Sequence, residues 1–255
     1  MIKIENLGKC FDGKWAVQAL NLEIAPGELF CFLGPNGAGK TTTIKMLTGL
    51  LKPTTGRALI GGYDIQTHPV EAKRQIGYVP DHPYVYEKLS GRDFYHFVGD
   101  MFHVPREAQD RRMAELFKVM LLSESIDEYI ENYSHGMRQK LVISVALMRH
   151  PNVIIIDEPM VGLDPRSAHI VKRLFKEQTS RGACLFLSTH TLSVAEELAD
   201  RIGIINRGDL IFLGTVAQLR EETKASGNLE ELFLALTTSE GELEEAARAG
   251  AVGLR

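Results

Sequence analysis

Hydrophobic and polar residues alternate at a period of two along the first stretch, MIKIENL, which is typical of a strand with one buried face. The stretch LNLEIAPGELFCFLG predicts two further strands, joined at Pro26 and Gly27. The next stretch, GPNGAGKTTTIKMLTGLL, predicts a tight loop followed by a helix. The first part of the chain is therefore expected to form strands, followed by one tight loop that leads into a helix.

The pattern changes from about Asp81 to Met148. This part has few β-branched runs and is rich in helix formers, as in EAQDRRMAELFKVMLL. We predict a helical subdomain over residues 81–150. From about Thr215 the chain becomes polar and acidic, as in REETKASGNLEEL, and residues 216–255 are expected to form a helical tail that carries no recognisable motif.

Short apolar runs return after the helical subdomain. NVIIIDEP and ACLFLSTH predict buried parallel strands, and RIGIINRGDLIFLG predicts a closing hairpin. Between the two runs, SAHIVKRLFKEQ places four apolar residues on one helical face: Ile170, Val171, Leu174 and Phe175. Together with the first strands, these elements predict an α/β core with a mainly parallel sheet, formed by residues 1–80 and 151–215.

Composition narrows the possible classes of protein. The formal charge of −4 gives no general basic surface, so we expect no nucleic-acid partner. The three cysteines (Cys10, Cys31 and Cys184) show neither metal-binding spacing nor a CxxC pair, which favours a reducing compartment. MIKIENLGKCF does not resemble a signal peptide, and no stretch approaches the roughly 18 apolar residues of a membrane span.

The stretch GPNGAGKT, residues 34–41, fits the phosphate-binding pattern G-x-x-x-x-G-K-[ST]. Glycines allow the backbone to wrap closely, so that N–H groups and the following helix start point at phosphate oxygens. Lys40 can bridge the β- and γ-phosphates, and Thr41 can ligate Mg²⁺. A Gly-rich turn that binds nothing is the alternative. The residues expected to bind ATP are Gly34, Pro35, Asn36, Gly37, Ala38, Gly39, Lys40, Thr41 and Thr42.

Acidic residues end one predicted strand and a histidine ends another. Asp157 and Glu158 follow the run VIII, and His190 follows CLFLST. Since ligands of open α/β sheets bind at the carboxyl ends of the strands, Asp157 is expected to hold Mg²⁺. Glu158 is expected to act as general base toward a water, and His190 to donate a hydrogen bond to the γ-phosphate. Taken alone, such residues are often only solvated strand ends.

The stretch YSHGMRQK, residues 133–140, predicts a helix start with Ser134 as N-cap, but it contains no catalytic group. Taken alone it predicts a capped core helix. However, the order of phosphate loop, YSHGMRQK, IIIDEP, GLDP and STH resembles the ATP-binding subunit of ABC transporters, in particular the exporter-type branch. The resemblance covers roughly residues 1–215. It implies a P-loop NTPase fold of the ABC ATPase type, with a mainly parallel sheet, antiparallel β strands and a helical subdomain.

The resemblance also implies how YSHGMRQK works. In this family the corresponding signature loop meets ATP held by a second ATP-binding subunit, here expected to be an identical chain. Ser134, His135 and Gly136 would contact that ATP, and Asp164 in GLDP would contact the partner subunit. Phe11 occupies the place of the aromatic residue that stacks on adenine, with Trp15 as its competitor.

Three residues depart from the family pattern. Asp81 in GYVPD stands where many members have Gln, which would reach Mg²⁺ or the attacking water, so the resemblance makes Asp81 a third expected metal residue beside Thr41 and Asp157. His135 replaces a glycine, and an L-residue does not freely adopt positive φ. Met137 replaces the Gln of the signature. These changes are compatible with slower hydrolysis.

The resemblance predicts an ATPase that uses ATP and Mg²⁺ and sits on the cytoplasmic face of the membrane, bound to a separate permease. A groove near residues 81–92 would receive the permease, although most rings of Tyr84, Tyr86, Phe94, Tyr95 and Phe97 are expected in the core of the lobe. The alternatives are a regulatory switch, or an ABC ATPase acting on nucleic acid or ribosomes. The sequence does not identify the cargo.

Overall fold

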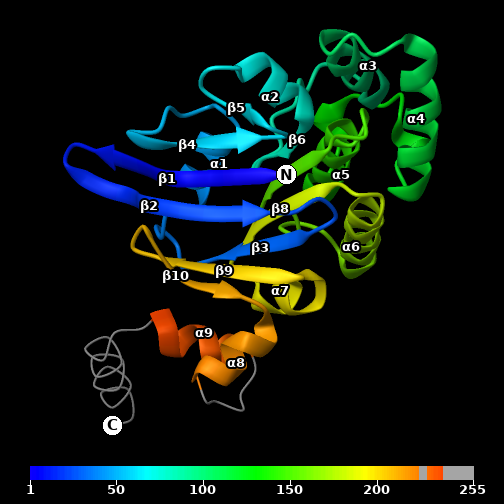
Figure 1. Ribbon diagram of the computed structural model, residues 1–255. Coiled ribbons are helices and arrows are strands. Elements are labelled where there is room, and N and C mark those ends of the chain that lie inside the picture. Colours follow the sequence, from blue (N-terminus) through cyan, green and yellow to red (C-terminus); the bar gives the residue numbers. More distant parts are fainter. Residues whose placement is uncertain (224–228, 238–255) are drawn as a thin grey trace.

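Two β-sheets form the centre of the computed structural model, which describes residues 1–223 and 229–237 (Figure 1). The smaller sheet is antiparallel and has the strand order β2-β1-β4-β5. Ile2 and Ile4 are buried whereas Lys3 between them is exposed, so the alternation predicted for this stretch is confirmed. The strands of this sheet are β1 (Ile2–Phe11), β2 (Lys14–Ile24), β4 (Thr55–Ile60) and β5 (Tyr63–Asp64).

The larger sheet has the order β10-β9-β3-β8-β7-β6, and it is parallel except for β10, which pairs antiparallel with β9. Every residue of β3, β7 and β8 is buried, as the continuous apolar runs predict. Pro26 and Gly27 join strands of two different sheets. The strands are β3 (Leu29–Leu33), β6 (Ile76–Val79), β7 (Val153–Asp157), β8 (Cys184–Thr189), β9 (Arg201–Asn206) and β10 (Asp209–Gly214).

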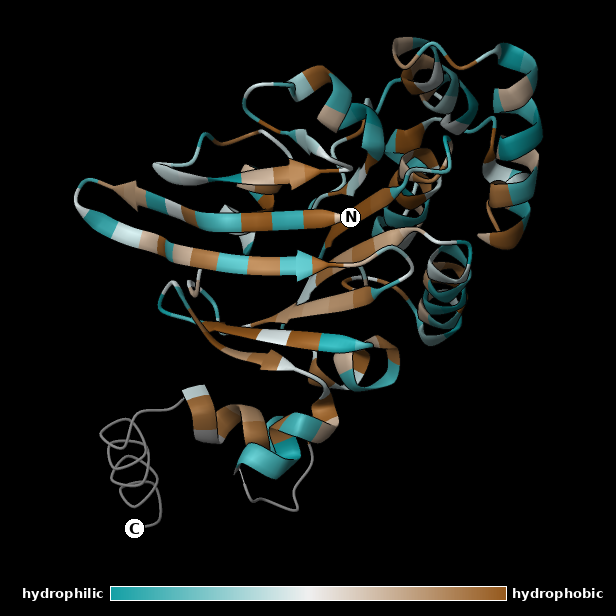
Figure 2. Cartoon of the chain, viewed as in Figure 1, coloured by the Kyte–Doolittle hydropathy of each residue, from teal (hydrophilic) through white to brown (hydrophobic). Residues whose placement is uncertain are grey.

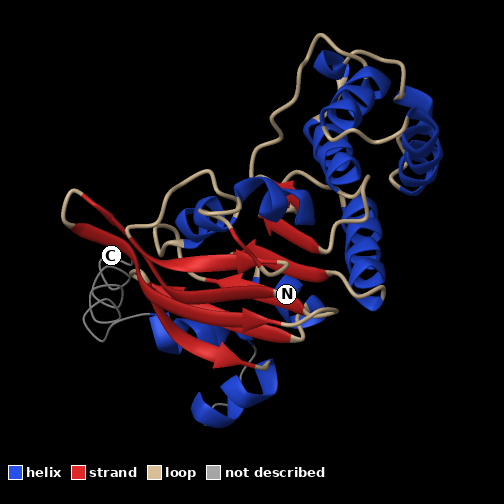
Figure 3. Ribbon diagram, turned by 45° about the horizontal axis from the view of Figure 1, so that its top comes forward, coloured by secondary structure: helices blue, strands red, loops and turns tan. Residues whose placement is uncertain are grey.

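Helices flank the sheets and form a separate lobe, which stands apart from the strands in Figure 3. The lobe contains α3 (Gly91–Met101), α4 (Arg106–Val119) and α5 (His135–Ala146), with short 3₁₀ turns at Ser123–Ser125 and Ile130–Asn132. The other helices are α1 (Lys40–Leu47), α2 (Pro69–Gln75), α6 (Pro165–Ser180), α7 (Leu192–Leu198), α8 (Val216–Thr223) and α9 (Leu229–Thr237). The predicted helical tail is therefore seen in α8 and α9, and its remainder (224–228 and 238–255) lies outside the described residues.

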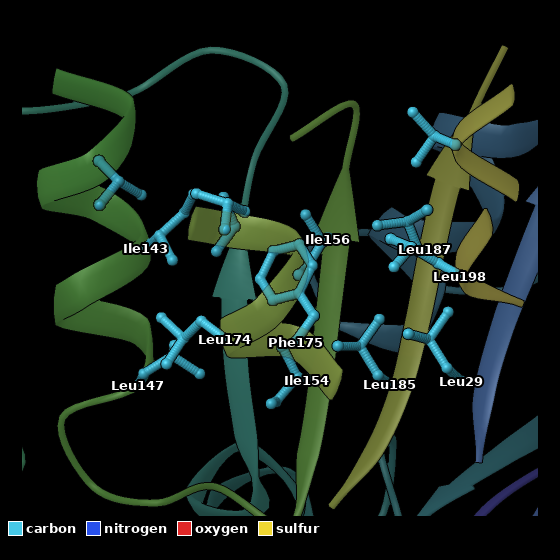
Figure 4. Packing of buried hydrophobic residues seen from close by; sticks show 14 of the residues in the cluster. Leu29, Ile143, Leu147, Ile154, Ile156, Leu174, Phe175, Leu185, Leu187 and Leu198 are labelled. Carbon is cyan, nitrogen blue, oxygen red and sulfur yellow. The ribbon is translucent and has the colours of Figure 1, made fainter. Parts of the chain in front are cut away.

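One hydrophobic core joins the lobe to the larger sheet. Leu174 and Phe175 of α6 pack against strand residues such as Ile154 and Leu185, and α5 contributes Ile143 (Figure 4). Hydropathy colouring shows the same division, since the central strands are mainly apolar and the outer helix α4 is mixed (Figure 2). Burying one such side chain stabilises the fold by about 1.5–3 kcal/mol. The lobe is therefore held in place by apolar packing.

The aromatic residues before and within α3 differ from the prediction. Only Phe94 and Tyr95 are buried, whereas Tyr84, Tyr86 and Phe97 are exposed by 79%, 60% and 42%. The expectation that most of these rings lie in the core of the lobe was wrong. Tyr84 and Tyr86 precede the first turn of α3, and Phe97, which lies beside Phe94 on that helix, packs edge-on against the exposed ring of Tyr86 and not inside the lobe.

No helix among the described residues has both the length and the apolar character that a membrane span requires. The proposed boundaries at residues 80, 150 and 215 remain a prediction, although α3, α4 and α5 all fall between the first two.

Candidate functional site

The predicted phosphate loop lies between the end of β3 at Leu33 and the start of α1 at Lys40. Its glycines are required by close packing. A Cβ on Gly34 would lie 2.4 Å from the carbonyl oxygen of Ile205, and a Cβ on Gly39 would lie 2.4 Å from that of Ala16. Gly39 also has φ = 114°, a conformation that disfavours other residues. The neighbouring backbone therefore dictates glycine at both positions.

Lys40 points back into this loop. Its Nζ donates hydrogen bonds to the carbonyl oxygens of Gly34 (2.6 Å) and Pro35 (3.1 Å). Burial lowers the pKa of Lys40, while the charges of Glu158 and Asp157 oppose that shift. The ammonium group is thus held at the mouth of the loop, where several oxygen atoms of a phosphate could replace the carbonyl partners.

Thr41 and Asp157 meet across the strand ends, with Thr41 Oγ1 donating to Asp157 Oδ2 at 3.1 Å. Burial raises the pKa of the Asp157 carboxyl, and the charges of Asp81 and Glu158 add to that rise. A hydroxyl and a carboxylate are hard oxygen ligands that suit Mg²⁺, which is commonly held by one or two carboxylates and substrate phosphates. The described residues contain no group of three or more His, Cys, Asp or Glu side chains placed to hold a metal ion.

Glu158 directly follows β7 in the left-handed conformation (φ = 49°) and is held by β8. Its Oε1 lies 2.7 Å from His190 Nδ1 and accepts from the His190 backbone N–H at 2.9 Å. Its Oε2 accepts from the Thr189 hydroxyl at 3.0 Å. Because an ionised carboxylate only accepts, Nδ1 of His190 carries the proton and Nε2 of the neutral ring is an acceptor. Donation from His190 to a γ-phosphate therefore requires the imidazolium or release of Glu158.

These groups line one cavity of about 310 Å³. They come together because β3, β7 and β8 are parallel and in register, with Leu33 opposite Thr189 and Asp157 opposite Ser188. The sequence missed Thr189, whose only signal was its place beside His190 at the end of β8. The cavity is lined by Asn36, Gly37, Gly39, Lys40, Thr41, Thr42, Asp81, Asp157, Glu158 and His190.

Phe11 and Trp15 lie at the turn between β1 and β2, and both are partly exposed. Neither lines the phosphate cavity. The strand that follows Trp15 nevertheless passes beside the loop, because the Ala16 carbonyl packs against Gly39. Lys9 Nζ lies 5.1 Å from the centroid of the Phe11 ring, so this ring already has one cationic neighbour. Adenine stacking by Phe11 remains a prediction.

Residues 134–136 open α5 outside this cavity. Ser134 is the N-cap and accepts a hydrogen bond from the Met137 backbone N–H at 3.2 Å, as predicted. His135 is the first helical residue and does not have positive φ, so the expected backbone conflict at this position was wrong. The α5 start packs on the loop before α6, where a Cβ on Gly162 would lie 2.0 Å from His135 Cδ2.

Asp164 caps α6 by accepting from the backbone N–H and the hydroxyl of Ser167, at 2.9 and 2.6 Å. The bond from the Ser167 hydroxyl is the main reason that the pKa of Asp164 is lowered. A contact of Asp164 with a partner subunit remains a prediction.

Comparison with known families and proteins gives a consistent result. A family described as ABC transporter matches residues 17–161. The linearmycin resistance ATP-binding protein LnrL of Bacillus subtilis is 36% identical over 219 residues, which is 86% of this chain and 70% of LnrL. The chain spans between 26% and 70% of the length of the curated relatives that it matches.

Solved structures share the fold, as two examples illustrate. The ATP-binding subunit of an ABC transporter superposes with a TM-score of 0.89 at 30% identity, covering 93% of this chain and all of that chain. A dimeric ATP-binding cassette in a post-hydrolysis state, bound to ADP and Pi, has a TM-score of 0.77 at 24% identity and covers 85% of this chain and 99% of its own.

Proposed function

Since this chain belongs to the ABC transporter family and is one of its ATP-binding ATPases, we propose that it powers transport through a separate membrane permease by ATP-driven dimerisation and hydrolysis-driven release. The observation that carries the proposal is the convergence of Lys40, Thr41, Asp157, Glu158 and His190 on one cavity. Each residue comes from a strand end or a helix start, so the constellation is fixed by the core and not by mobile loops.

Each group has a proposed role in this cavity. Loop N–H groups and Lys40 bind the phosphates of ATP. Thr41 and Asp157 hold Mg²⁺, which when bound neutralises charge on the phosphate oxygens. Glu158 accepts a proton from the attacking water, and the hydrogen bonds from His190 and Thr189 fix the direction of its carboxylate. The polar walls thus fit phosphoryl transfer to water.

Dimerisation is supported by the location of the signature loop. Ser134 and His135 are exposed at the start of a helix, yet they do not line the phosphate cavity of their own chain. A helix start is suited to bind anions. We propose that Ser134, His135 and Gly136 bind the γ-phosphate of ATP held by a second, identical subunit, with Asp164 and its loop beside them. The dimeric cassette described above supports the same assembly.

A groove between lobe and core suits the permease. It encloses about 330 Å³, and its walls include Tyr78, Pro80, Phe94, Val98 and Val142. Tyr84 and Phe102 also line it, with 79% and 44% of their surface exposed. We propose that an apolar segment of the permease docks here, next to the stretch that carries Asp81 to the cavity. This docking would hold the chain on the cytoplasmic face of the membrane.

The exporter assignment is supported by LnrL, whose name records linearmycin resistance. A second candidate, a regulatory switch with slow turnover, is favoured by one observation. Asp81 brings an additional negative charge toward Asp157 in the same cavity, where many family members have a neutral Gln. Steady-state ATP turnover distinguishes the candidates, because a transport ATPase turns over continuously whereas a switch does not.

Light scattering of Glu158→Gln with and without MgATP tests the proposal. Removal of the base should trap ATP, because the phosphate loop and Asp157 remain intact. We expect a monomer without nucleotide and a dimer with MgATP. A monomer that binds MgATP without dimerising would contradict self-pairing, and a chain that does not bind ATP would contradict the whole assignment. Adding Lys40→Ala to the variant provides the control, since it should abolish the response to ATP.

A further inference from the structure

The helical lobe contains a further polar cavity. It encloses about 310 Å³ between α4 and the segment after α5, and its polar walls are formed by Arg111, Arg112, Glu115 and His150. It shares no lining residue with the phosphate cavity or with the groove proposed for the permease. None of its residues has a role in the proposed ATPase reaction.

Arg112 is the central feature of this cavity. Its Nη1 pairs with Glu115 Oε2 at 2.9 Å, and 11% of its side chain is exposed. Its Nε and Nη2 are buried and have no hydrogen-bond partner within residues 1–223 and 229–237. The N–H groups on these two atoms are parallel and form the side-on fork that binds a carboxylate or phosphate through two hydrogen bonds.

Unmatched N–H groups of a buried guanidinium are unfavourable, because they have lost water without gaining an acceptor. Arg138 provides a comparison within the same lobe. Its Nη1 pairs with Glu87 and its Nη2 donates to the Glu131 carbonyl, so only Nε lacks a partner in the described part of the chain. Arg112 differs because the complete fork is unpaired, which indicates a ligand with two acceptor oxygens.

The surroundings of Arg112 favour an anion. Arg111 and His150 line the same cavity, and Arg181 is close enough to influence both His150 and Glu115. Burial lowers the pKa of His150, and the charges of Arg112 and Arg181 lower it further. Glu115 is the single acidic residue of the lining, and it is engaged by Arg112 Nη1. The local charge is therefore positive although the whole chain carries −4.

We propose that this cavity binds a phosphate group, free or as the phosphate ester of a lipid headgroup, through the guanidinium of Arg112, whose buried Nε–Nη2 fork turns into the cavity to meet it. Arg111 lies beside the bound group and balances its second charge, and the neutral ring of His150 can donate a hydrogen bond to it. Val104 and Met148 supply an apolar wall that accommodates the organic part of an ester. The site is separate from ATP binding, so its ligand would act on the lobe and not on the phosphate loop.

The first experiment is an NMR titration of the full chain labelled with ¹⁵N-arginine. Saturating Mg²⁺ and a non-hydrolysable ATP analogue occupy the phosphate loop, so that added inorganic phosphate reports on other sites. The Nε–H resonance of Arg112 is assigned in the wild type by through-bond correlation to its own backbone, and its loss in Arg112→Lys confirms the assignment. We expect this resonance to shift with saturation while that of Arg106, on an exposed part of the same helix, does not. The wild-type titration tests the site even if a variant fails to fold.

The second experiment separates the two sources of phosphate. Binding to phosphatidylcholine vesicles with and without phosphatidylglycerol is measured by co-sedimentation. Arg112→Lys keeps the positive charge but loses the Nε–Nη2 fork. It should lower the affinity for whichever ligand responds by about tenfold or more. Lys118→Gln removes a charge from the same helix and is the control. A response to free phosphate supports a soluble ligand, and a response only to phosphatidylglycerol supports a headgroup. The proposal is overturned if neither ligand responds, or if Lys118→Gln weakens binding as much as Arg112→Lys.

Discussion

Nδ1 of His190 lies 2.7 Å from Oε1 of Glu158, and the same oxygen accepts the His190 backbone N–H at 2.9 Å. His190 therefore makes two hydrogen bonds to one carboxylate oxygen of Glu158, while the Thr189 hydroxyl donates to the other oxygen. A general base is effective only when its carboxylate is directed at the water that it deprotonates. The contact assigns His190 to holding Glu158, with the phosphate as a second partner only after a change of protonation or geometry.

We expect His190→Ala to lower kcat for ATP hydrolysis by about 10²–10⁴-fold, the usual contribution of a positioned general base. ATP affinity should change little, because Lys40 and the loop N–H groups are untouched. Steady-state turnover and fluorescence titration with an ATP analogue measure the two quantities. Thr189→Val, which removes a single neutral hydrogen bond to Oε2, is the matched comparison and should have a smaller effect. Unchanged kcat in His190→Ala would show that Glu158 does not depend on this contact.

The sequence predicted the parts of the site that depend on local chemistry. The glycine spacing at 34–41 and the acids after VIII follow from the needs of a phosphate and a buried parallel strand, so the Thr41–Asp157 contact could be anticipated. The Glu158–His190 contact could not, because it depends on the in-register pairing of β7 and β8. Linear spacing of 32 residues carries no information about which ring nitrogen faces which oxygen.

We expect Asp157→Asn to raise Tm in the absence of Mg²⁺ and nucleotide, and to remove the stabilisation that MgATP gives the wild type. Burial raises the pKa of Asp157, so the folded state holds this proton more tightly than the unfolded state. The wild type should therefore lose stability as pH rises from the ordinary carboxyl pKa of about 3.9 through the raised folded value. Asp157→Asn has no carboxyl at this position, so its stability lacks this pH-dependent loss.

Thermal melts of wild type and Asp157→Asn from about pH 4 to pH 7 measure that difference, which should widen as pH rises. Asp164→Asn is the control, because hydrogen bonds from Ser167 lower the pKa of Asp164 and should give the opposite sign. A constant difference in Tm across the range would contradict the buried-charge explanation.

We expect Gly162→Ala to destabilise the chain by more than Gly182→Ala. Both glycines have positive φ (77° and 95°), which makes an alanine unfavourable by about 1 kcal/mol. A methyl on Gly162 would also lie 2.0 Å from His135 Cδ2, whereas a methyl on Gly182 meets no atom within 4 Å among the residues described. Overpacking of this kind adds about 1–3 kcal/mol.

A double-mutant cycle in urea denaturation separates the two contributions to the Gly162→Ala effect. In a His135→Ala background the steric part should vanish and the effect should approach that of Gly182→Ala. An equal loss of stability in both backgrounds would mean that the imidazole moves aside, and that the start of α5 is not locked to the loop before α6.

The helix cap in the signature loop was predicted correctly from the sequence, whereas the exposure of several rings in the helical lobe was not. Ser134 was predicted as an N-cap from residue type alone, and the bond to Met137 confirms it. The exposure of Tyr84, Tyr86 and Phe97 was not predicted, because the hydropathy of an aromatic residue is the same whether its ring is buried in the core or exposed at a binding surface. The structure distinguishes the two cases, and of the three rings it places Tyr84 in the lining of the apolar groove.

We expect Ser134→Asp to fold as stably as the wild type but to fail to dimerise with MgATP in the Glu158→Gln background. Aspartate caps helices as well as serine does, so the bond to the Met137 N–H is replaced. The added negative charge would face the γ-phosphate of the partner's ATP and repel it. ATP binding by the same chain should be retained, because Ser134 does not line its own phosphate cavity.

Ser134→Ala is the comparison: it should lose about 1 kcal/mol of stability with the cap while still dimerising. Thermal melts, nucleotide titration and light scattering give the three quantities, and a Ser134→Asp chain that dimerises normally would remove residues 134–136 from the interface.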